Sequence, residues 1–394
     1  MRSVAKLREV AVVGIGETKF GSLPDRSLRD LVNEAGNKAI IDSGLPKEKI
    51  QALYVGNFNS SYLCGQSHMG ALVSEELSLG NIPTLRVENA CVSGGLAFRM
   101  GMMMVAAGVY DYVLVGGVEK MTHRETEVVT SALASAADSE FETALGATFP
   151  SLFAMIANRY MYEFKSPREH LAMVAVQNHD NALLNPDAQM HKKITVEKAL
   201  TGFPVASPFT LYDCSLITDG AVFAVITTSE IAKSLNQKRP LVEVVGSGHA
   251  GDSIQLALKK SLTTFSATVD AAKQAYDMAR LNPEDIDFAE VHDCFTITQI
   301  INTEDLGFFE KGLGGKAVEQ GLTSIEGKLP INPSGGLKAK GHPIGATGLS
   351  QIYEVTLQLR GEAGERQLKN VEIGLAHNIG GTAASCSVHI LRRR

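Results

Sequence analysis

The chain has 394 residues, of which 44% are hydrophobic and 20% charged, and a formal net charge of −6. This length exceeds one ordinary hydrophobic core, so we expect two or three structural units in a well-packed globular protein. The acidic balance argues against a protein that binds nucleic acid. The sequence contains no apolar run that approaches the length of a membrane span.

Five cysteines are scattered along the chain without a CxxC pair. This pattern favours free thiols in a reducing compartment over a disulfide framework, and it lacks the ligand spacing of a metal site. The apolar run at residues 10–14 is too short and too strand-like for a signal peptide. We therefore expect a cytoplasmic protein with no bound metal.

Short apolar runs rich in β-branched residues predict buried strands in the first part of the chain. They cover residues 10–14, 52–56, 85–87 and 112–116. Helices are expected over 28–41, where apolar residues recur at helical spacing, and over 90–108, where they occupy nearly every face. This alternation of strands and helices predicts a layered α/β fold.

The composition changes between residues 119 and 208, where helical stretches at 152–162 and 169–184 predict an inserted helical subdomain. The α/β alternation then resumes. Strands are expected at 221–226, 241–245, 288–291, 371–376 and 386–390, and helices at 268–278 and 349–359. Because the second half repeats the order of the first, we expect two similar α/β halves: residues 1–120 plus 208–245 and residues 246–394, with an insert at 121–207.

Cys91 lies between a predicted strand and the helix that follows it. A cysteine at a helix N-terminus feels the positive end of the backbone dipole, which lowers the pKa of its thiol. Gly94 and Gly95 would let a second element approach this turn. Cys91 is therefore a candidate nucleophile, although a free cysteine is more often a small buried hydrophobic residue.

A glycine-rich run from Asn332 to Gly348 surrounds His342 and opens the last long helix. A histidine held rigidly beside a helix start is a candidate base for activating a nucleophile. Cys294 follows a predicted strand, in the place where α/β folds put ligand sites. The alternative is a buried cysteine beside a capping Asp293.

His377 also follows a predicted strand and precedes the pair Gly380-Gly381. These glycines could supply backbone N–H groups to an oxyanion hole, or they could simply form a turn. Taken alone, His377 could equally be a hydrogen-bonded histidine of the core.

Together these loops resemble those of the thiolase superfamily over essentially the whole chain. The resemblance rests on Cys91 in its turn of small residues, on Gly341-His-Pro-Ile-Gly-Ala-Thr-Gly348, and on the order of the loops. Two departures resemble archaeal and sterol-carrier-protein-type thiolases. His292-Asp-Cys-Phe295 replaces the usual Asn-Glu-Ala-Phe, and His377-Asn-Ile-Gly380 replaces the usual Cys-x-Gly loop.

The resemblance implies a thiolase-like layered α/β fold and a role for each candidate residue. Cys91 would be the nucleophile, His342 its base and Cys294 the second acid/base, while His292 and His377 would shape the site. The backbone N–H groups of Cys91 and Gly380 would form the oxyanion hole.

Coenzyme A thioesters would be the substrates, with no bound cofactor. Ser247, in the run Gly246-Ser-Gly248, would contact CoA from a loop, and Met121 and Phe149 would line the acyl pocket. The alternatives are that such runs form ordinary turns and that methionine and phenylalanine belong to the core.

The activity expected from this resemblance is that of an acetyl-CoA C-acetyltransferase. The alternatives are a degradative 3-ketoacyl-CoA thiolase, a non-catalytic thiolase-like subunit, or an aldolase of the same fold, which would be expected to lack Cys91. The resemblance also implies a homodimer or homotetramer. Hydroxymethylglutaryl-CoA synthase and a small acyl-CoA-binding protein with an OB-fold and zinc ribbon would be possible partners.

Overall fold

The computed structural model describes residues 7–235 and 237–394, so the first six residues of the expected N-terminal half lie outside it. Nine strands form a mixed sheet in the order β3-β2-β4-β7-β1-β8-β11-β10-β9. The strands are β1 (Val10–Glu17), β2 (Ala52–Gly56), β3 (Thr84–Val87), β4 (Tyr112–Glu119), β7 (Gly220–Thr228), β8 (Val242–Gly251), β9 (Phe288–Glu290), β10 (Ile373–Gly380) and β11 (Ser385–Arg393).

Two halves of the sheet meet where β1 pairs with β8 in antiparallel register. In the first half, β2 runs parallel to β3 and β4; in the second, β9 runs parallel to β10. The two halves correspond at their outer edges as well. Ile331 forms a parallel bridge to Ala289 of β9, just as β3 runs parallel to β2 in the first half. The expected pair of similar α/β halves is therefore present.

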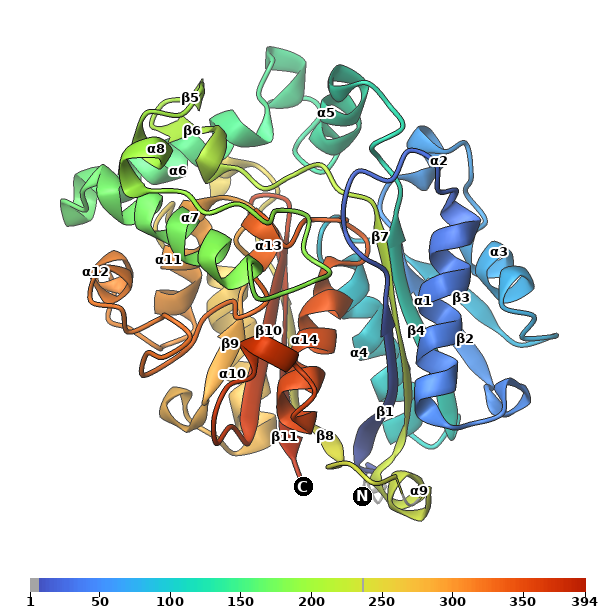
Figure 1. Ribbon diagram of the computed structural model, residues 1–394. Helices are drawn as coiled ribbons and strands as arrows, with labels where there is room; N and C mark the ends of the chain where they lie inside the picture. Colours follow the sequence, from blue (N-terminus) through green and yellow to red (C-terminus); the bar gives the residue numbers. More distant parts are fainter. Residues whose placement is uncertain (1–6, 236) are drawn as a thin grey trace, which may run out of the picture.

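Helices form three layers around the two half-sheets (Figure 1). The central layer consists of α4 (Ser93–Ala106) and α14 (Thr347–Arg360), whose apolar side chains share one core with both half-sheets. The outer layers contain α1 (Leu28–Ser43) and α3 (Met69–Glu76) on the first half, and α10 (Ser266–Ala279) and α11 (Thr296–Asp305) on the second.

The segment expected as an insert lies beyond one end of the sheet, at the top of Figure 1. It contains α5 (Thr126–Ala134), α6 (Phe149–Phe164), α7 (Arg168–Ala182), α8 (Val196–Leu200) and the hairpin of β5 (Pro204–Ala206) and β6 (Phe209–Thr210). The remaining short helices are α2 (Ser60–Leu63), α9 (Ser229–Ser234), α12 (Gly314–Glu319) and α13 (Gly336–Ala339).

The bounds of helix α11 were not predicted from the sequence. All of its residues from Thr296 to Asp305 are buried, and many of them are polar. Buried hydroxyl and amide groups find partners in neighbouring segments: Thr298 and Asn302, for example, donate to the carbonyl oxygen of His292. Ile297, Ile300 and Ile301 recur at helical spacing, but the buried polar residues around them hide how far the helix extends.

The run Gly246-Ser-Gly248 was wrongly expected to form a loop, because it lies inside β8. The Ser247 hydroxyl is buried, accepts a hydrogen bond from Arg99 and bonds to Nδ1 of His389, whose Nε2 donates to the carbonyl oxygen of Gly95. Arg99 and His389 thus form hydrogen bonds with the Ser247 hydroxyl inside the protein. The glycines serve packing instead, since Gly246 and Gly248 lie directly against the backbone of α10.

Replacing Gly248 with Ala should destabilise the fold. A Cβ at this position would lie 1.8 Å from the carbonyl oxygen of Ala271 in α10, so β8 and α10 would have to separate. We expect a loss of about 1–3 kcal/mol or more, measured by urea unfolding. Gly251→Ala in the same strand is the matched control, because its Cβ would have its nearest neighbour at 3.6 Å. Equal stability of the two variants would contradict the packing argument.

Candidate active site

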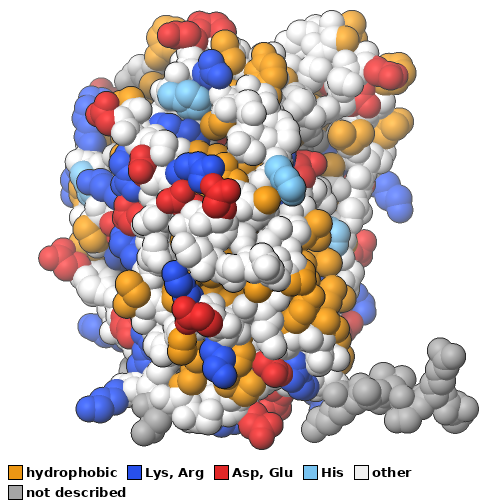
Figure 2. Space-filling view, turned by 90° about the vertical axis from the view of Figure 1, so that its right-hand side faces the viewer, with side chains coloured by type: hydrophobic (Ala, Val, Ile, Leu, Met, Phe, Trp, Pro, Cys, Tyr) orange, Lys and Arg blue, Asp and Glu red, His pale blue; other side chains and the backbone are white. Residues whose placement is uncertain are grey.

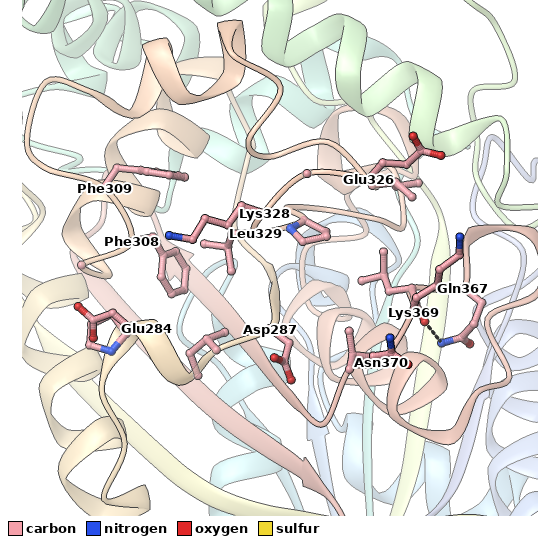
Figure 3. A pocket seen from close by; sticks show the side chains of 18 of the residues that line it. Glu284, Asp287, Phe308, Phe309, Glu326, Lys328, Leu329, Gln367, Lys369 and Asn370 are labelled. Carbon is pink, nitrogen blue, oxygen red and sulfur yellow. Dashed lines mark hydrogen bonds between the residues drawn. The ribbon is translucent and has the colours of Figure 1, made fainter.

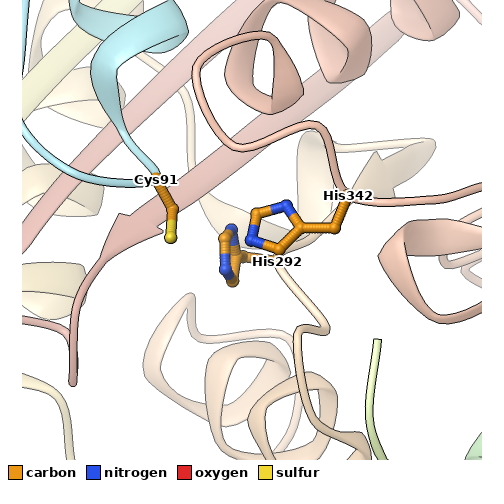
Figure 4. Close-up of side chains that lie close together, drawn as sticks. All are labelled: Cys91, His292 and His342. Carbon is orange, nitrogen blue, oxygen red and sulfur yellow. The ribbon is translucent and has the colours of Figure 1, made fainter. Parts of the chain in front are cut away.

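Three loops from different parts of the chain bring Cys91, His292 and His342 together (Figure 4). The Cys91 sulfur and one ring nitrogen of each histidine all lie within 4.8 Å of one another. Cys91 precedes α4 and His342 precedes α14, so the thiol and the imidazole meet at the N-termini of the two central helices. His292 enters from the loop that follows β9.

The Cys91 turn is tight and strained. Ala90 has a φ of +49°, a conformation that costs a residue with a side chain about 1 kcal/mol or more. The Ser93 hydroxyl accepts from the N–H of Asn89 and donates to the carbonyl oxygen of Ala90, which closes the turn. Gly94 is required because a Cβ there would lie 2.7 Å from the carbonyl oxygen of Gly345 in the histidine loop.

Burial raises the pKa of the Cys91 thiol to about 12, although its sulfur accepts hydrogen bonds from the N–H groups of Gly381 and of Cys91 itself. We expected the helix terminus to lower this pKa. The loss of hydration at this partly buried thiol outweighs the backbone donors. The thiol is therefore neutral in the free protein and needs a base at the moment of reaction.

His342 is suited to that task. Burial lowers the pKa of its imidazole to about 3, so the ring is neutral at physiological pH. Its Nδ1 lies 2.7 Å from the hydroxyl of Thr347, and this hydroxyl can donate to the carbonyl oxygen of Pro343. The network assigns the proton to Nδ1 and leaves Nε2 free to accept a proton in the site.

Two buried carboxylates fix the loop that carries His342. Asp293 accepts from the backbone N–H groups of Leu337 and Lys338, and Glu119 accepts from the N–H of Gly345. These bonds lie on both sides of His342 along the chain. The imidazole is therefore placed by a rigid backbone rather than by its own contacts alone.

Asn378 is a site residue that the sequence analysis missed. Its Nδ2 lies 2.8 Å from Nδ1 of His292, while Nε2 of His292 is buried and has no hydrogen-bond partner among the described residues. The rings of His292 and His342 meet edge to face, with centroids 5.2 Å apart. An amide that donates to Nδ1 leaves the proton on Nε2, where it can be donated to a bound oxygen.

His377, the residue before Asn378, points to the other face of β10. Its Nε2 bonds to the hydroxyl of Thr268 in α10, and its Nδ1 accepts from the backbone N–H of His292. Neighbouring residues in a strand point to opposite faces, so only one of the two can enter the site. The alternation of the strand would have identified Asn378. His377 instead supports the backbone of His292.

Cys294 is buried in the core that also contains Phe153 and Phe295. Burial raises the pKa of its thiol well above the usual value, and the nearby Cys91 thiol raises it further. Thr298 and the N–H of Phe295 donate to its sulfur and oppose this shift. The second thiol is thus protonated in the free protein, and it lies close enough to Cys91 that a negative charge on one sulfur disfavours a negative charge on the other.

The other predicted contacts lie in two places. Met121 packs in the apolar cluster that borders Cys91, and Phe149 packs against the cluster that contains Cys294. Gly380 lies beside the Cys91 turn, since its Cβ would meet the carbonyl oxygen of Asn89 at 2.8 Å. It is the next residue, Gly381, whose N–H bonds to the Cys91 sulfur.

A cavity of about 850 Å³ lies away from these residues (Figure 3). Its lining includes Asp287, which precedes β9, and Asn370, which precedes β10. Cys91 and His292 lie instead near the other ends of these parallel strands. The size of this cavity therefore does not mark it as the site of the thiol chemistry.

Charged side chains of both signs are interspersed on the side of the molecule that carries α3 (Figure 2). Among the residues that the structure describes, none of the helices is long and apolar enough to cross a membrane.

Two models of thiolase domains match the chain: the thiolase N-terminal domain over residues 10–230 and the thiolase C-terminal domain-like model over 248–393. Acetyl-CoA acetyltransferase of Methanothermobacter thermautotrophicus is 50% identical to it, over 98% of this chain and 100% of that protein. The protein of the same name from Methanocaldococcus jannaschii is 44% identical, over 98% and 99%. Sterol carrier protein 2 of Bos taurus is 34% identical, over 94% of this chain and 70% of that protein.

Solved structures share the fold. An Ltp2-ChsH2(DUF35) aldolase superposes with a TM-score of 0.85 at 24% identity, over 98% of both chains. Acetyl-CoA acetyltransferase from Syntrophomonas wolfei gives 0.74 at 21% identity, over 98% of this chain and 99% of that one. With both domain models matched in order and archaeal relatives aligned over nearly their whole length, this chain belongs to the thiolase family and is a thiolase-type acyltransferase.

Proposed function

We propose that this protein is an acetyl-CoA C-acetyltransferase. It would condense two molecules of acetyl-CoA to acetoacetyl-CoA and free CoA through an acyl-cysteine, in a reversible reaction. The observation that carries the proposal is the meeting of the Cys91 thiol with the neutral His342 imidazole beside a second thiol, Cys294. The names of the two archaeal relatives support acetyl-CoA as the substrate.

In the first half-reaction, Nε2 of His342 takes the proton of Cys91, and the thiolate attacks the thioester carbonyl carbon. The tetrahedral oxyanion is stabilised by two backbone N–H groups. One would be that of Cys91, and the other that of Gly380 or of its neighbour Gly381. When the C–S bond to CoA breaks, the Cys294 thiol protonates the leaving CoA. The site then holds acetyl-Cys91, a His342 imidazolium and a Cys294 thiolate, whose charges offset each other.

In the second half-reaction, the Cys294 thiolate removes a proton from the methyl carbon of a second acetyl-CoA. The enolate oxygen accepts hydrogen bonds from Nε2–H of His292 and of the His342 imidazolium. The carbanion attacks acetyl-Cys91, and the departing sulfur of Cys91 recovers its proton from His342. Both thiols and the neutral imidazole are restored, so the protons balance over the cycle.

The apolar cluster beside Cys91 favours a short acyl group. Phe58, Met121 and Ile344 are buried there and already fill the space next to the turn. A degradative 3-ketoacyl-CoA thiolase that takes longer chains would need this cluster to open. The presence of both thiols argues against a non-catalytic subunit, and Cys91 argues against an aldolase of this fold.

Assembly stays a prediction. A homodimer or homotetramer is expected, as is association with hydroxymethylglutaryl-CoA synthase through a small acyl-CoA-binding protein with an OB-fold and zinc ribbon.

Incubation with acetyl-CoA should place one acetyl group on Cys91, seen by intact-mass spectrometry. The adduct should be absent in Cys91→Ala and present after long incubation in Cys294→Ala. Condensation should fall by about 10²–10⁴-fold in Cys294→Ala, which lacks the second acid/base. Cys64→Ala removes a thiol that is none of the reacting groups and should still form the adduct on Cys91. Full condensation by Cys294→Ala would refute the role of that thiol, and no adduct with any acyl-CoA would refute the function.

Alkylation of Cys91 by iodoacetamide should accelerate about tenfold per pH unit between about pH 6 and 9, because the pKa of this thiol is about 12 and only the thiolate reacts. The profile should show no step near the usual histidine value, since the pKa of His342 is about 3 and its charge does not change in this range. Mass spectrometry of the Cys91 peptide gives the rate. A plateau reached by neutral pH would instead reveal a thiolate–imidazolium pair.

Asn378→Leu should impair enolate formation more than acylation. The variant removes the amide that donates to Nδ1 of His292 and so frees the ring to adopt the other tautomer. We expect a loss of about 1–3 kcal/mol of transition-state stabilisation, roughly 5- to 150-fold in condensation rate. The rate of acetyl-Cys91 formation should change by only a few-fold. An equal loss in both half-reactions would indicate a merely structural role.

A further inference from the structure

We propose that Cys91, His292 and His342 also form a zinc site, which binds one Zn²⁺ ion through a thiolate and two imidazoles and thereby blocks the catalytic thiol. The ligands come from positions 91, 292 and 342 of the chain, so no local sequence spacing could reveal them. This set of donors would leave one position of a tetrahedral ion open to water.

The distances between the three side chains suit zinc. Their candidate ligand atoms lie within 4.8 Å of one another. Zn–S bonds of about 2.3 Å and Zn–N bonds of about 2.0–2.1 Å place tetrahedral ligands roughly 3.3–3.6 Å apart. Shifts of about 1 Å or less in each side chain would therefore complete the coordination.

The two ring nitrogens needed for the ion are not used by the protein. Nε2 of His292 is fully buried and has no hydrogen-bond partner in residues 7–235 and 237–394. His342 binds Thr347 through Nδ1, which leaves its Nε2 in the site. A buried imidazole nitrogen without a partner has lost its hydration without compensation, so an ion at this point would restore an interaction.

The groups behind the ligands can orient them for a metal. Nδ1–H of His342 can donate to the Thr347 hydroxyl, as metal-bound histidines commonly donate through their other nitrogen. For His292 the same arrangement requires the Asn378 amide to turn, so that Oδ1 accepts from Nδ1–H. Within the part of the chain that the structure describes, that oxygen is buried without a partner, and so is the hydroxyl of Ser387, the residue opposite Asn378 on β11.

Binding releases one proton, because the Cys91 thiol loses its proton to solvent as the Zn–S bond forms. Thiolate and imidazole select Zn²⁺ over Mg²⁺ and Ca²⁺, which prefer oxygen ligands.

Zinc would inhibit by occupying both partners of the first proton transfer, the sulfur of Cys91 and Nε2 of His342. The inhibition rests on the proposed function. Binding of the ion does not, because it depends only on the three side chains. A binding measurement therefore separates the two proposals.

Titration of the whole protein with Cd²⁺, a probe that reports thiolate ligation by an ultraviolet charge-transfer band, tests the site. We expect one ion per chain, competition by Zn²⁺ and no competition by Mg²⁺. Cys91→Ser should abolish the band, and His292→Asn or His342→Asn should weaken affinity by about 100-fold or more. Cys64→Ser and His68→Asn, which alter a thiol and an exposed histidine outside the site, should bind as the unmodified protein does. A band that survives in Cys91→Ser would overturn the proposal.

A second measurement needs no variant. Zn²⁺ should protect Cys91 from iodoacetamide, with the Cys91 peptide followed by mass spectrometry, and EDTA should restore its reactivity. Acetyl transfer should stop when Zn²⁺ is added and recover when EDTA removes it. Unchanged alkylation of Cys91 at saturating Zn²⁺ would refute the site. Protection without any acetyl transfer in the metal-free protein would instead leave the zinc site standing and refute the proposed function.

Discussion

Buried carboxylates that bind the glycine-rich loop are the interaction on which the site depends. Every residue from 331 to 350 is buried, yet much of this segment is irregular and cannot satisfy its own N–H groups. Acidic side chains of the surrounding elements supply acceptors. They are Glu290 for Ser334, Asp293 for Leu337 and Lys338, Glu17 for Lys340 and Ser350, and Glu119 for Gly345. Without them the loop could not remain in the interior.

Burying these carboxylates costs free energy, which their hydrogen bonds must offset. Burial raises the pKa of Glu119 and of Asp293 to about 7 and that of Glu290 to about 8, even though backbone or side-chain donors oppose the shift. Charge in a dry interior is unfavourable unless it is fully hydrogen-bonded. The arrangement is stable because each carboxylate binds several donors at once. The hydrogen-bonded loop therefore holds His342 in position before any substrate binds.

Much of the architecture could be predicted from the sequence, because its strands are continuous apolar runs and several of its long helices carry apolar residues at helical spacing. The turns of Cys91 and His342 were recognisable because glycines cluster beside a reactive residue. The direction of the shift in the Cys91 pKa could not be predicted, since it depends on how much water the folded protein removes from the thiol. Asn378 was overlooked although strand alternation marked it, and Glu119 could not be linked to Gly345 because the sequence does not show which loops meet.

The two reacting side chains belong to different halves of the molecule. Cys91 opens the central helix of the first half and His342 opens that of the second, and the halves are joined in the sheet by the pairing of β1 with β8. Neither half contains a working pair of nucleophile and base. Separation of the halves would therefore end the chemistry before either half had unfolded. In this protein, acyl transfer would report the fraction of molecules that are native throughout, which makes turnover a sensitive gauge of partial unfolding.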